Sequence, residues 1–354
     1  MKIIIITVLM TLNILAGEII EMLPYKHHEF SPILKQHFQI PFTLKKEAKV
    51  TVEIYTPDNT LIRTLQSRSL KEGEQSVVWD GKDSHGTIVP NEAYNIVLIA
   101  QSSDQKEVID PRMSGGEIIK NLQTKLTKQG SIVYHLSAPS RVLVRAGIEN
   151  GPMLRVISNW IPKNSGKVLQ RWNMRDVDNM VDISHLKFSV SVTAFALPKY
   201  TIITTNNKKL NYFEYFTQNG FTCPTIDQEE QLLIRDDKGI SKHFYSCRIQ
   251  DRDPRVNLEI PNAPKKEVPI LQNGKQTLIK VTMHPEDEAI FEKAKYEVSF
   301  FIDFKFSSEE ELGYMPISWN FNPNALKKGE HVLSVNVSTF QGQVGVRSLK
   351  FLVE

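Results

Sequence analysis

The chain has 354 residues, a length that accommodates about two to four domains, and its 41% hydrophobic content is typical of folded proteins rather than disordered ones. Its 43 basic and 40 acidic residues leave a formal net charge of +3. Nucleic-acid-binding proteins usually concentrate an excess of basic residues on one face, so we expect no nucleic-acid partner.

The amino-terminal segment has the pattern of a signal peptide. Lys2 precedes an apolar run over residues 3–15, and Ala16-Gly17 supplies small residues for cleavage. The run is too short to cross a bilayer core of about 30 Å as a permanent helix. We therefore predict a signal peptide over residues 1–16 and a mature chain in the periplasm or outside the cell, without a transmembrane anchor. The alternative is an apolar first strand of a cytosolic domain.

Short strands separated by turn residues are predicted in the first domain, residues 17–101. Val50, Val52 and Ile54 alternate with polar residues, which is the period of a half-buried strand. The expected strands cover residues 48–55, 61–65, 76–79 and 94–99. Trp79 ends the third of them, and the residues that follow it tolerate positive φ in a tight loop. This regular spacing predicts a β-sandwich.

The residues around that loop resemble a known module. The run from Trp79 to Tyr94, with Phe30-Ser31-Pro32 upstream, is similar to the Ig-like module first described in the flagellar hook-capping protein and shared by many exported bacterial proteins. The resemblance implies structural roles for Trp79, Asp80, Gly81, Asp83 and Gly86. It covers about a quarter of the chain and implies no chemistry, because such modules are spacers and binding platforms in unrelated proteins.

A diverged copy of this module is predicted over residues 130–200, after a linker over residues 102–129. The run Gly166–Trp172 parallels Gly73–Trp79, so Trp172 stands where Trp79 stands, as a structural residue. The glycines equivalent to Gly81 and Gly86 are lost. A repeat of this kind predicts a second Ig-like sandwich.

Trp160 lies in a longer insert of that second copy. A loop that grows between fixed strands is a candidate binding loop, so Trp160 is a candidate binding residue. The alternative is a tryptophan packed over the edge of the sandwich.

Residues 201–273 are predicted to form a β-rich extension that holds a glycan platform or a packed aromatic core. Tyr212 and Tyr215 are candidate binding residues if their rings are exposed, whereas alternating aromatics in a strand are also typical of core packing. Two cysteines in an exported chain predict the disulfide Cys223–Cys247. Two free buried thiols are the alternative.

A last sandwich is predicted over residues 274–354. Its Gly-x-His-x-Leu-x-Val-x-Val pattern, from Gly329 onwards, is similar to the last strands of cadherin-like and fibronectin-like sandwiches. Trp319 lies in one of its strands and is expected to be structural. The predicted fold class is therefore all-β, with tandem Ig-like and fibronectin-like β-sandwich domains.

No catalytic motif is present in the sequence. It contains no GxxxxGK[ST] or GxGxxG loop, no GxSxG elbow, no HExxH and no CxxC. We predict no catalytic residue, metal site or cofactor, and an exported scaffold or adhesion-type protein that contacts proteins of a bacterial envelope or extracellular assembly. The alternatives are a protein that binds carbohydrate or another surface, through Trp160, Tyr212 or Tyr215, and an enzyme with an unrecognised site.

Overall fold

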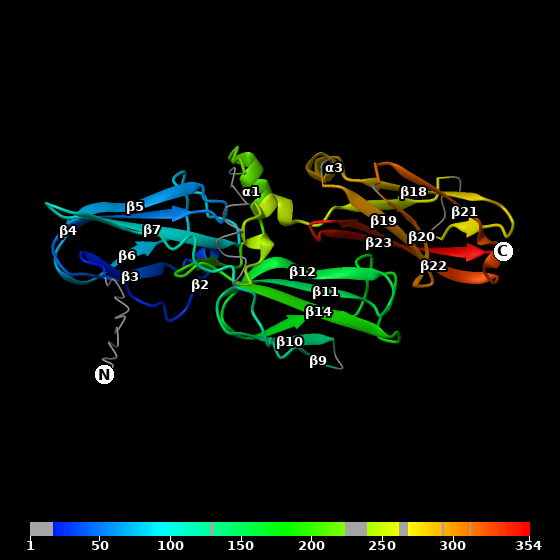
Figure 1. The fold of residues 1–354 in the computed structure, drawn as a ribbon, viewed down its shortest axis with the longest axis horizontal. Helices are drawn as coiled ribbons and strands as arrows, with labels where there is room; N and C mark the ends of the chain where they lie inside the picture. The colour runs from blue at the N-terminus through cyan, green and yellow to red at the C-terminus, as the bar shows by residue number, and fades with distance from the viewer. Residues whose placement is uncertain (1–16, 128–129, 224–238, 262–267, 292–293, 312) are drawn as a thin grey trace, which may run out of the picture. The chain divides into compact units, whose positions relative to one another are not determined.

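The computed structural model describes residues 17–127, 130–223, 239–261, 268–291, 294–311 and 313–354, so the predicted signal peptide lies outside the described residues. The chain divides into two compact units: unit 1 comprises Met1–Met113 and Tyr200–Leu210, and unit 2 comprises Ser114–Lys199 and Asn211–Glu354. Both are built from packed β-sheets (Figure 1), which confirms the predicted all-β fold. Among the described residues, no helix combines the length and the apolar character needed to cross a bilayer.

Unit 1 is a sandwich of two sheets. One sheet has the order β1 (Ile20–Met22), β3 (Phe38–Leu44), β6 (Gly73–Trp79). The other has the order β2 (Glu29–Phe30), β15 (Ile202–Thr204), β7 (Ala93–Gln101), β4 (Ala48–Tyr55), β5 (Leu61–Leu70), and β8 (Lys106–Ile109) also pairs with β7. Figure 1 shows the two layers, with β4, β5 and β7 in one and β3 and β6 in the other.

The core of unit 1 follows from alternation along these strands. Every second residue of β4 is buried, as the period of its hydrophobic residues predicts. The Trp79 and Tyr94 rings meet edge to face between the sheets, with centroids 5.3 Å apart. Asp83 closes the loop after Trp79, because its Oδ1 accepts hydrogen bonds of 2.9 Å from the backbone amides of His85 and Thr87.

Two segments outside the predicted first domain complete unit 1. Strand β8 lies in the predicted linker and pairs antiparallel with the end of β7. Strand β15 lies in the predicted extension and pairs with β2 and the start of β7. The sequence of β15 is only three residues long, too short for its periodicity to indicate a partner.

The first sandwich of unit 2 repeats the strand pairing of unit 1. One of its sheets has the order β12 (Met153–Lys163), β11 (Ser140–Ile148), β14 (Phe188–Ala196). The other has the order β13 (Gly166–Arg171), β10 (Ser131–Leu136), β9 (Lys125–Leu126). The pairing of β3 with β6 recurs as β10 with β13, and the pairing of β4 with β5 and β7 recurs as β11 with β12 and β14. We call this sandwich the second module and that of unit 1 the first module.

The loop after the module tryptophan also recurs, although its glycines do not. Trp79 Nε1 donates to the Lys82 carbonyl at 3.0 Å, and Trp172 Nε1 donates to the Arg175 carbonyl at 2.9 Å. Met174 (φ 55°) and Asn179 (φ 57°) adopt the left-handed conformation that Gly81 (φ 73°) and Gly86 (φ 82°) adopt in the first module. The turn geometry is therefore retained although both glycines are replaced, at position 179 by asparagine, which also tolerates positive φ.

The carboxyl-terminal sandwich, which we call the third module, has a three-stranded and a five-stranded sheet. The first has the order β16 (Val256–Glu259), β18 (Thr277–Met283), β21 (Ile317–Phe321). The second has the order β17 (Ile270–Leu271), β23 (Val344–Val353), β22 (Gly329–Thr339), β19 (Tyr296–Ile302), β20 (Lys305–Glu310). Trp319 packs against Phe300 and Phe321 at the core, with centroids 4.6 and 4.9 Å away.

The segment predicted as a β-rich extension contains helices as well as strands. It holds α1 (Tyr212–Gln218) and the 3₁₀ helices η3 (Lys242–Phe244) and η4 (Arg248–Asp251). Asn211 and Glu214 form a capping box, in which each side chain bonds the other residue's backbone amide. Tyr212, Tyr215 and Phe216 follow helical spacing, so the interpretation of these aromatics as a strand was wrong. The predicted disulfide Cys223–Cys247 is confirmed and lies beside this helix.

Candidate interaction site

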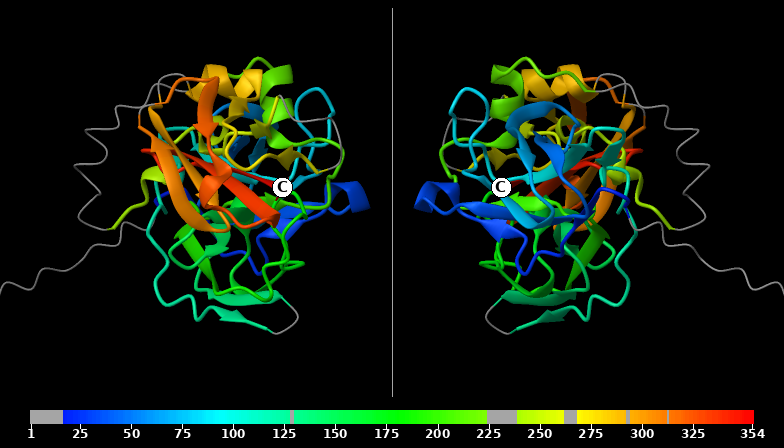
Figure 2. Two further views of the ribbon diagram at one scale, coloured as in Figure 1. Left: turned by 90° about the vertical axis from the view of Figure 1, so that its right-hand side faces the viewer. Right: turned by 90° about the vertical axis from the view of Figure 1, so that its left-hand side faces the viewer.

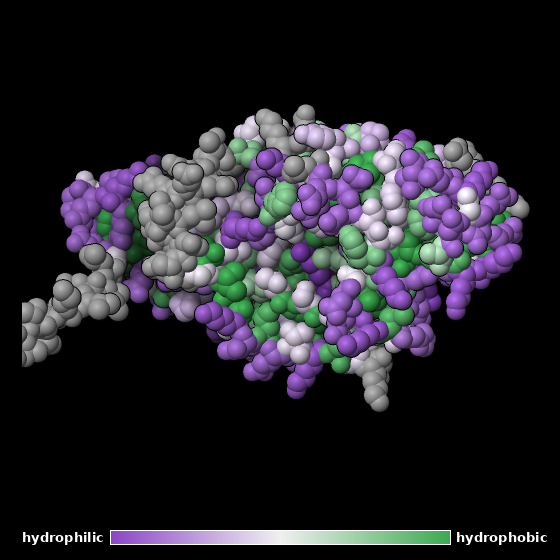
Figure 3. Space-filling model, turned by 45° about the vertical axis from the view of Figure 1, so that its right-hand side comes forward, coloured by the Kyte–Doolittle hydropathy of each residue, from purple (hydrophilic) through white to green (hydrophobic). Residues whose placement is uncertain are grey.

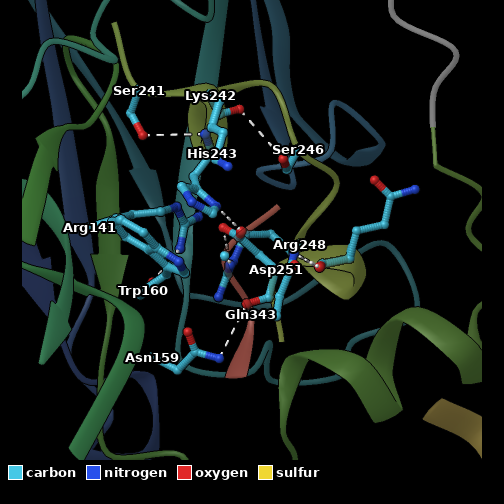
Figure 4. Close-up of polar contacts among 12 residues, drawn as sticks. Arg141, Asn159, Trp160, Ser241, Lys242, His243, Ser246, Arg248, Asp251 and Gln343 are labelled. Carbon is cyan, nitrogen blue, oxygen red and sulfur yellow. Dashed lines mark hydrogen bonds and ion pairs between the residues drawn. The ribbon is translucent and has the colours of Figure 1, made fainter. Parts of the chain in front are cut away.

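A buried polar cluster lies where the segment 239–255 packs against the second module. The Asp251 carboxylate is its centre (Figure 4): His243 Nδ1 contacts Oδ1, and Arg248 Nη1 lies 3.3 Å from Oδ2. The Trp160 ring packs against the His243 ring with centroids 4.4 Å apart and the ring planes tilted by 33°. A buried carboxylate is stable here because two cationic or hydrogen-bonding groups face it.

This segment links the second and third modules through hydrogen bonds. Asn159 Nδ2 of β12 donates to the Asp251 carbonyl at 3.2 Å, and Gln343 Nε2 donates to the Gln250 carbonyl at 2.7 Å. Arg145 of β11 donates to the Gly342 carbonyl at 2.6 Å and lies 3.5 Å from the Asp253 carboxylate. We call this set of contacts the junction.

Burial dominates the electrostatics of the junction. It raises the pKa of Asp253 to about 6, although Arg145 and the Val344 amide oppose the shift. Burial also lowers the pKa of Arg145. Asp253 and Arg145 therefore lie in a poorly solvated part of the junction, where their charged forms are less favourable than at the protein surface.

A groove of about 810 Å³ opens beside the junction. Helices α1 and α3 (Pro285–Phe291) lie on the same side of unit 2 in both Figure 1 and Figure 2. Residues of both helices line the groove. Its lining combines apolar, amide, carboxylate and guanidinium groups: Asn159, Asn211, Phe213, Glu214, Thr217, Gln218, Ile249, Arg252, Asp253, Arg255, Glu286 and Ile290. The space-filling view in Figure 3 shows a similar mixture of hydrophilic and hydrophobic residues over one face.

Two arginines on the groove are held by a buried carboxylate. Asp287 is fully buried, contacts Arg252, and accepts hydrogen bonds of 2.8 Å from both the backbone amide and Nε of Arg255. The Arg252 guanidinium also lies over the Phe213 ring at 5.5 Å. The arginines are thereby fixed in position before anything binds.

Three buried polar atoms on the groove lack a hydrogen-bond partner among the described residues: the donors Arg252 Nε and Nη2, of which Nη2 contacts the Asp287 carboxylate, and the acceptor Asn159 Oδ1. Buried polar groups are nearly always paired with protein or water, so such atoms mark where water or a ligand supplies the missing bond. The groove can therefore hold a molecule that offers both an acceptor and a donor.

The three predicted binding residues are buried. Trp160, Tyr212 and Tyr215 are 3%, 5% and 2% exposed. None of these rings therefore forms the exposed platform on which the glycan prediction depended. On α1 the tyrosines face the core, while Phe213, between them in sequence, faces the groove.

The groove residues were missed because four separate chain segments supply them. The spacing of Tyr212, Tyr215 and Phe216 could have indicated the helix and hence the outward place of Phe213. No local pattern indicates Arg252 or Asn159. Across the ranges that the structure describes, no three His, Cys, Asp or Glu side chains are grouped to hold a metal ion.

Comparisons with known proteins identify the first module. Residues 32–104 match the FlgD Ig-like domain. The basal-body rod modification proteins FlgD of Salmonella typhimurium (strain LT2) and Salmonella typhi are each 40% identical to this chain over 63 residues, which is 18% of this chain. The match spans 27% of the length of these relatives.

Similarities to solved structures are weak. The fibronectin(III)-like modules of CbhA from Clostridium thermocellum give a TM-score of 0.21 at 11% identity, covering 95% of this chain and 94% of that chain. A Ca²⁺-stabilised adhesin that helps an Antarctic bacterium bind ice gives a TM-score of 0.20 at 10% identity, and the match covers 92% of this chain and 71% of that chain. Residues 32–104 of this chain are a FlgD Ig-like domain.

Proposed function

We propose that this protein is an exported, non-catalytic scaffold or adhesion-type protein that makes protein–protein contacts in a bacterial envelope or extracellular assembly. The observation that carries the proposal is the preformed groove of unit 2, with fixed arginines and buried unpaired polar atoms, set on sandwich modules. Rigid sandwiches that present a contact surface are a common use of such folds, although fold alone does not assign a function.

The exported address is supported by two independent features. The disulfide Cys223–Cys247 is stable in an oxidising compartment and rare in a reducing one. The amino-terminal sequence has the pattern of a signal peptide, with cleavage expected after Ala16. Mass spectrometry of the native protein from fractionated cells tests this proposal. We expect a chain that begins at Gly17 with oxidised cysteines, and a cytosolic chain that begins at Met1 with free thiols would contradict it.

The groove favours a polypeptide segment as its ligand. It offers guanidinium donors, carboxylate and amide acceptors and the Phe213 ring, a mixture that matches a backbone with varied side chains. Specific interfaces commonly combine an arginine and an aromatic anchor with a polar rim.

Photo-crosslinking in the native envelope tests the contact. A photoreactive residue at Gln218, which lines the groove, is compared with one at exposed Lys328 of the third module. We expect a defined crosslinked protein at 218 but not at 328, and its loss when Phe213→Ala is added. Equal crosslinking at both positions, or none at 218, would reject the groove as the contact site.

Carbohydrate binding is a second candidate function for the same groove. The half-buried Phe213 ring lies there with the amide side chains of Asn159, Asn211 and Gln218, which is a combination that sugar sites use. Glycan-array binding by the purified chain, abolished by Phe213→Ala, would favour this function over a protein contact.

A further inference from the structure

One edge of the second module is open. Strand β14 pairs with β11 along its whole length. On its other side, Ala194 and Ala196 bond the segment 117–119, through Ile119 N to Ala194 O and Ala196 N to Glu117 O, both 2.9 Å. Among the described residues, no strand pairs with 188–192 on that side.

The direction of the free backbone groups follows from these two bonds. Successive residues of a strand point their backbone amide and carbonyl groups to alternate sides of the strand. The backbone groups of Phe188, Val190 and Val192 therefore point to the same side as the backbone groups of Ala194, away from β11. Their side chains pack against the core of the second module, whereas Ser189 and Ser191 are exposed. The edge therefore presents three residues with unused donors and acceptors.

The first module shows what covers the equivalent edge. Tyr94 of β7 corresponds to Phe188 of β14: each ring meets the tryptophan of its own module edge to face, at 5.3 and 5.9 Å. There, β15 pairs with Ala93 and Tyr94, and β8 pairs with the end of β7. Added strands thus pair with both ends of this edge in the first module, whereas the equivalent residues Phe188 and Val192 have no such partner among the described residues.

The open edge also lacks the charged side chains that usually deter pairing. Residues 188–193 are Phe, Ser, Val, Ser, Val and Thr. Other free edges carry charges, as β5 does with Arg63 and Arg68 and β13 with Lys167 and Arg171. Proteins that remain monomeric commonly protect edges with charged residues, prolines or bulges.

We propose that a second copy of this chain pairs with this edge, antiparallel and related by a two-fold axis at Val190. The stretch is nearly symmetric about Val190, with a serine on each side and an apolar residue beyond each serine. Phe188 then lies opposite Val192 of the other copy, and Ser189 opposite Ser191, so no like charges face each other. About six backbone hydrogen bonds form, and two three-stranded sheets become one continuous sheet.

The oligomeric state of the full chain tests the proposal, independently of the groove contact. Light scattering across a wide concentration range is expected to give twice the monomer mass at high concentration for the wild type and for Val190→Ala. Val190→Pro is expected to remain a monomer, because proline removes the outward amide at a position where edge strands tolerate it. A wild type that stays monomeric, or a dimer that Val190→Pro leaves intact, would overturn the proposal.

Cysteine crosslinking gives a readout that does not depend on a proline. Residues 189 and 191 of opposite copies lie directly opposed, about 4.5–5.5 Å apart at Cα, within disulfide range. A mixture of Ser189→Cys and Ser191→Cys chains should therefore oxidise to a linked dimer faster than either variant alone, since like positions lie about 7–8 Å apart. Equal rates in the mixture and the single variants would count against this register and overturn it.

Discussion

Two glycines of the first module share a backbone conformation but not an environment. Gly81 and Gly86 both have positive φ, where a side chain is strained. A Cβ at Gly81 would overlap the Pro32 ring, whereas a Cβ at Gly86 would meet open space. Substitutions at Gly86 therefore measure the cost of backbone strain alone, and substitutions at Gly81 measure the same strain together with steric overlap.

We predict that Gly86→Ala lowers the free energy of unfolding of unit 1 by about 1 kcal/mol, from backbone strain alone. Gly81→Ala should lower it by about 3 kcal/mol, because overlap with Pro32 adds to the same strain. Native-state hydrogen exchange of the β4 and β7 amides measures both. Equal losses in the two variants would show that the Pro32 contact is unimportant.

The Asp253 carboxyl gives unit 2 a pH dependence with a definite sign. Its folded pKa, raised by burial to about 6, exceeds the value of about 3.9 expected in the unfolded chain, so the folded state binds the proton more tightly. The resulting stabilisation is complete below pH ~4 and is lost as pH rises through about 6. Its full size is about 2–3 kcal/mol.

We therefore expect Asp253→Asn to flatten the fall in unfolding free energy of unit 2 between pH ~4 and ~6. The charges of Arg145 and Asp251 act on the Asp253 carboxyl, so both residues are kept in this variant. The control is Asp182→Asn, an exposed carboxyl whose pKa is lowered by hydrogen bonds from Ser184. Denaturant titrations across this pH range provide the measurement, and an unchanged profile in Asp253→Asn would refute the assignment.

The residues of the candidate site were harder to predict than those of the fold. Trp79 and the loop after it are consecutive, so local turn chemistry identified them. Arg252 and Asn159 meet only because the segment 239–255 folds back on β12, and their role depends on burial that no short pattern encodes. Trp160 was predicted as a contact residue because it lies in the longer insert of the second copy, yet this insert forms β12 and the Trp160 ring packs against His243.

At the scale of elements, long amphipathic strands were predictable and short or helical ones were not. The alternation in β4 fixes its faces, because period two is evident over all eight of its residues. Strand β7 was predictable for another reason, because it is an apolar run that is buried along most of its length. Strand β15 has only three residues, and its partners β2 and β7 are distant in the sequence. Helix α1 was mistaken for a strand because aromatic residues favour strands and the capping box was overlooked.

The disulfide supports α1 and hence the wall of the groove. Cys247 packs with Tyr212 and Phe216 of α1, and its bond to Cys223 closes a loop with a sequence separation of 24. In the chain-entropy model a loop of this size contributes about 3–4 kcal/mol. We predict that the double variant Cys223→Ser, Cys247→Ser opens α1 locally while the third module stays folded.

Hydrogen exchange of the full chain checks this prediction. The α1 amides should lose protection in the double variant, and the β22 amides should keep it, because β22 belongs to a separate core. Reduction of the wild type should reproduce the effect. Loss of protection throughout unit 2 would show instead that the bond stabilises the whole unit.

At the scale of the whole molecule, the modules of unit 2 are joined by more than the chain. The Asn336 side chain of β22 bonds both the amide and the carbonyl of Met153 at 2.8 Å, as a neighbouring strand would. Asp178 accepts a 2.9 Å bond from the Ser348 amide and lies 2.6 Å from Arg347. Such contacts require a matched surface on each module, which no sequence pattern of one module indicates.

We predict that the second and third modules reorient as one body in the wild type and separately in the variant Asp178→Ala, Asn336→Ala. The variant leaves the Met153 backbone groups and the Ser348 amide without their side-chain partners, and each unpaired buried group costs about 1–3 kcal/mol. Residual dipolar couplings are expected to fit one alignment tensor in the wild type and two in the variant. Asp182→Ala is the matched control, because the Asp182 carboxylate pairs with Arg175 inside the second module and should leave a single tensor. A single tensor in the double variant would mean that the remaining contacts, such as Phe304 and Val332 against the second module, hold the modules together without these two side chains.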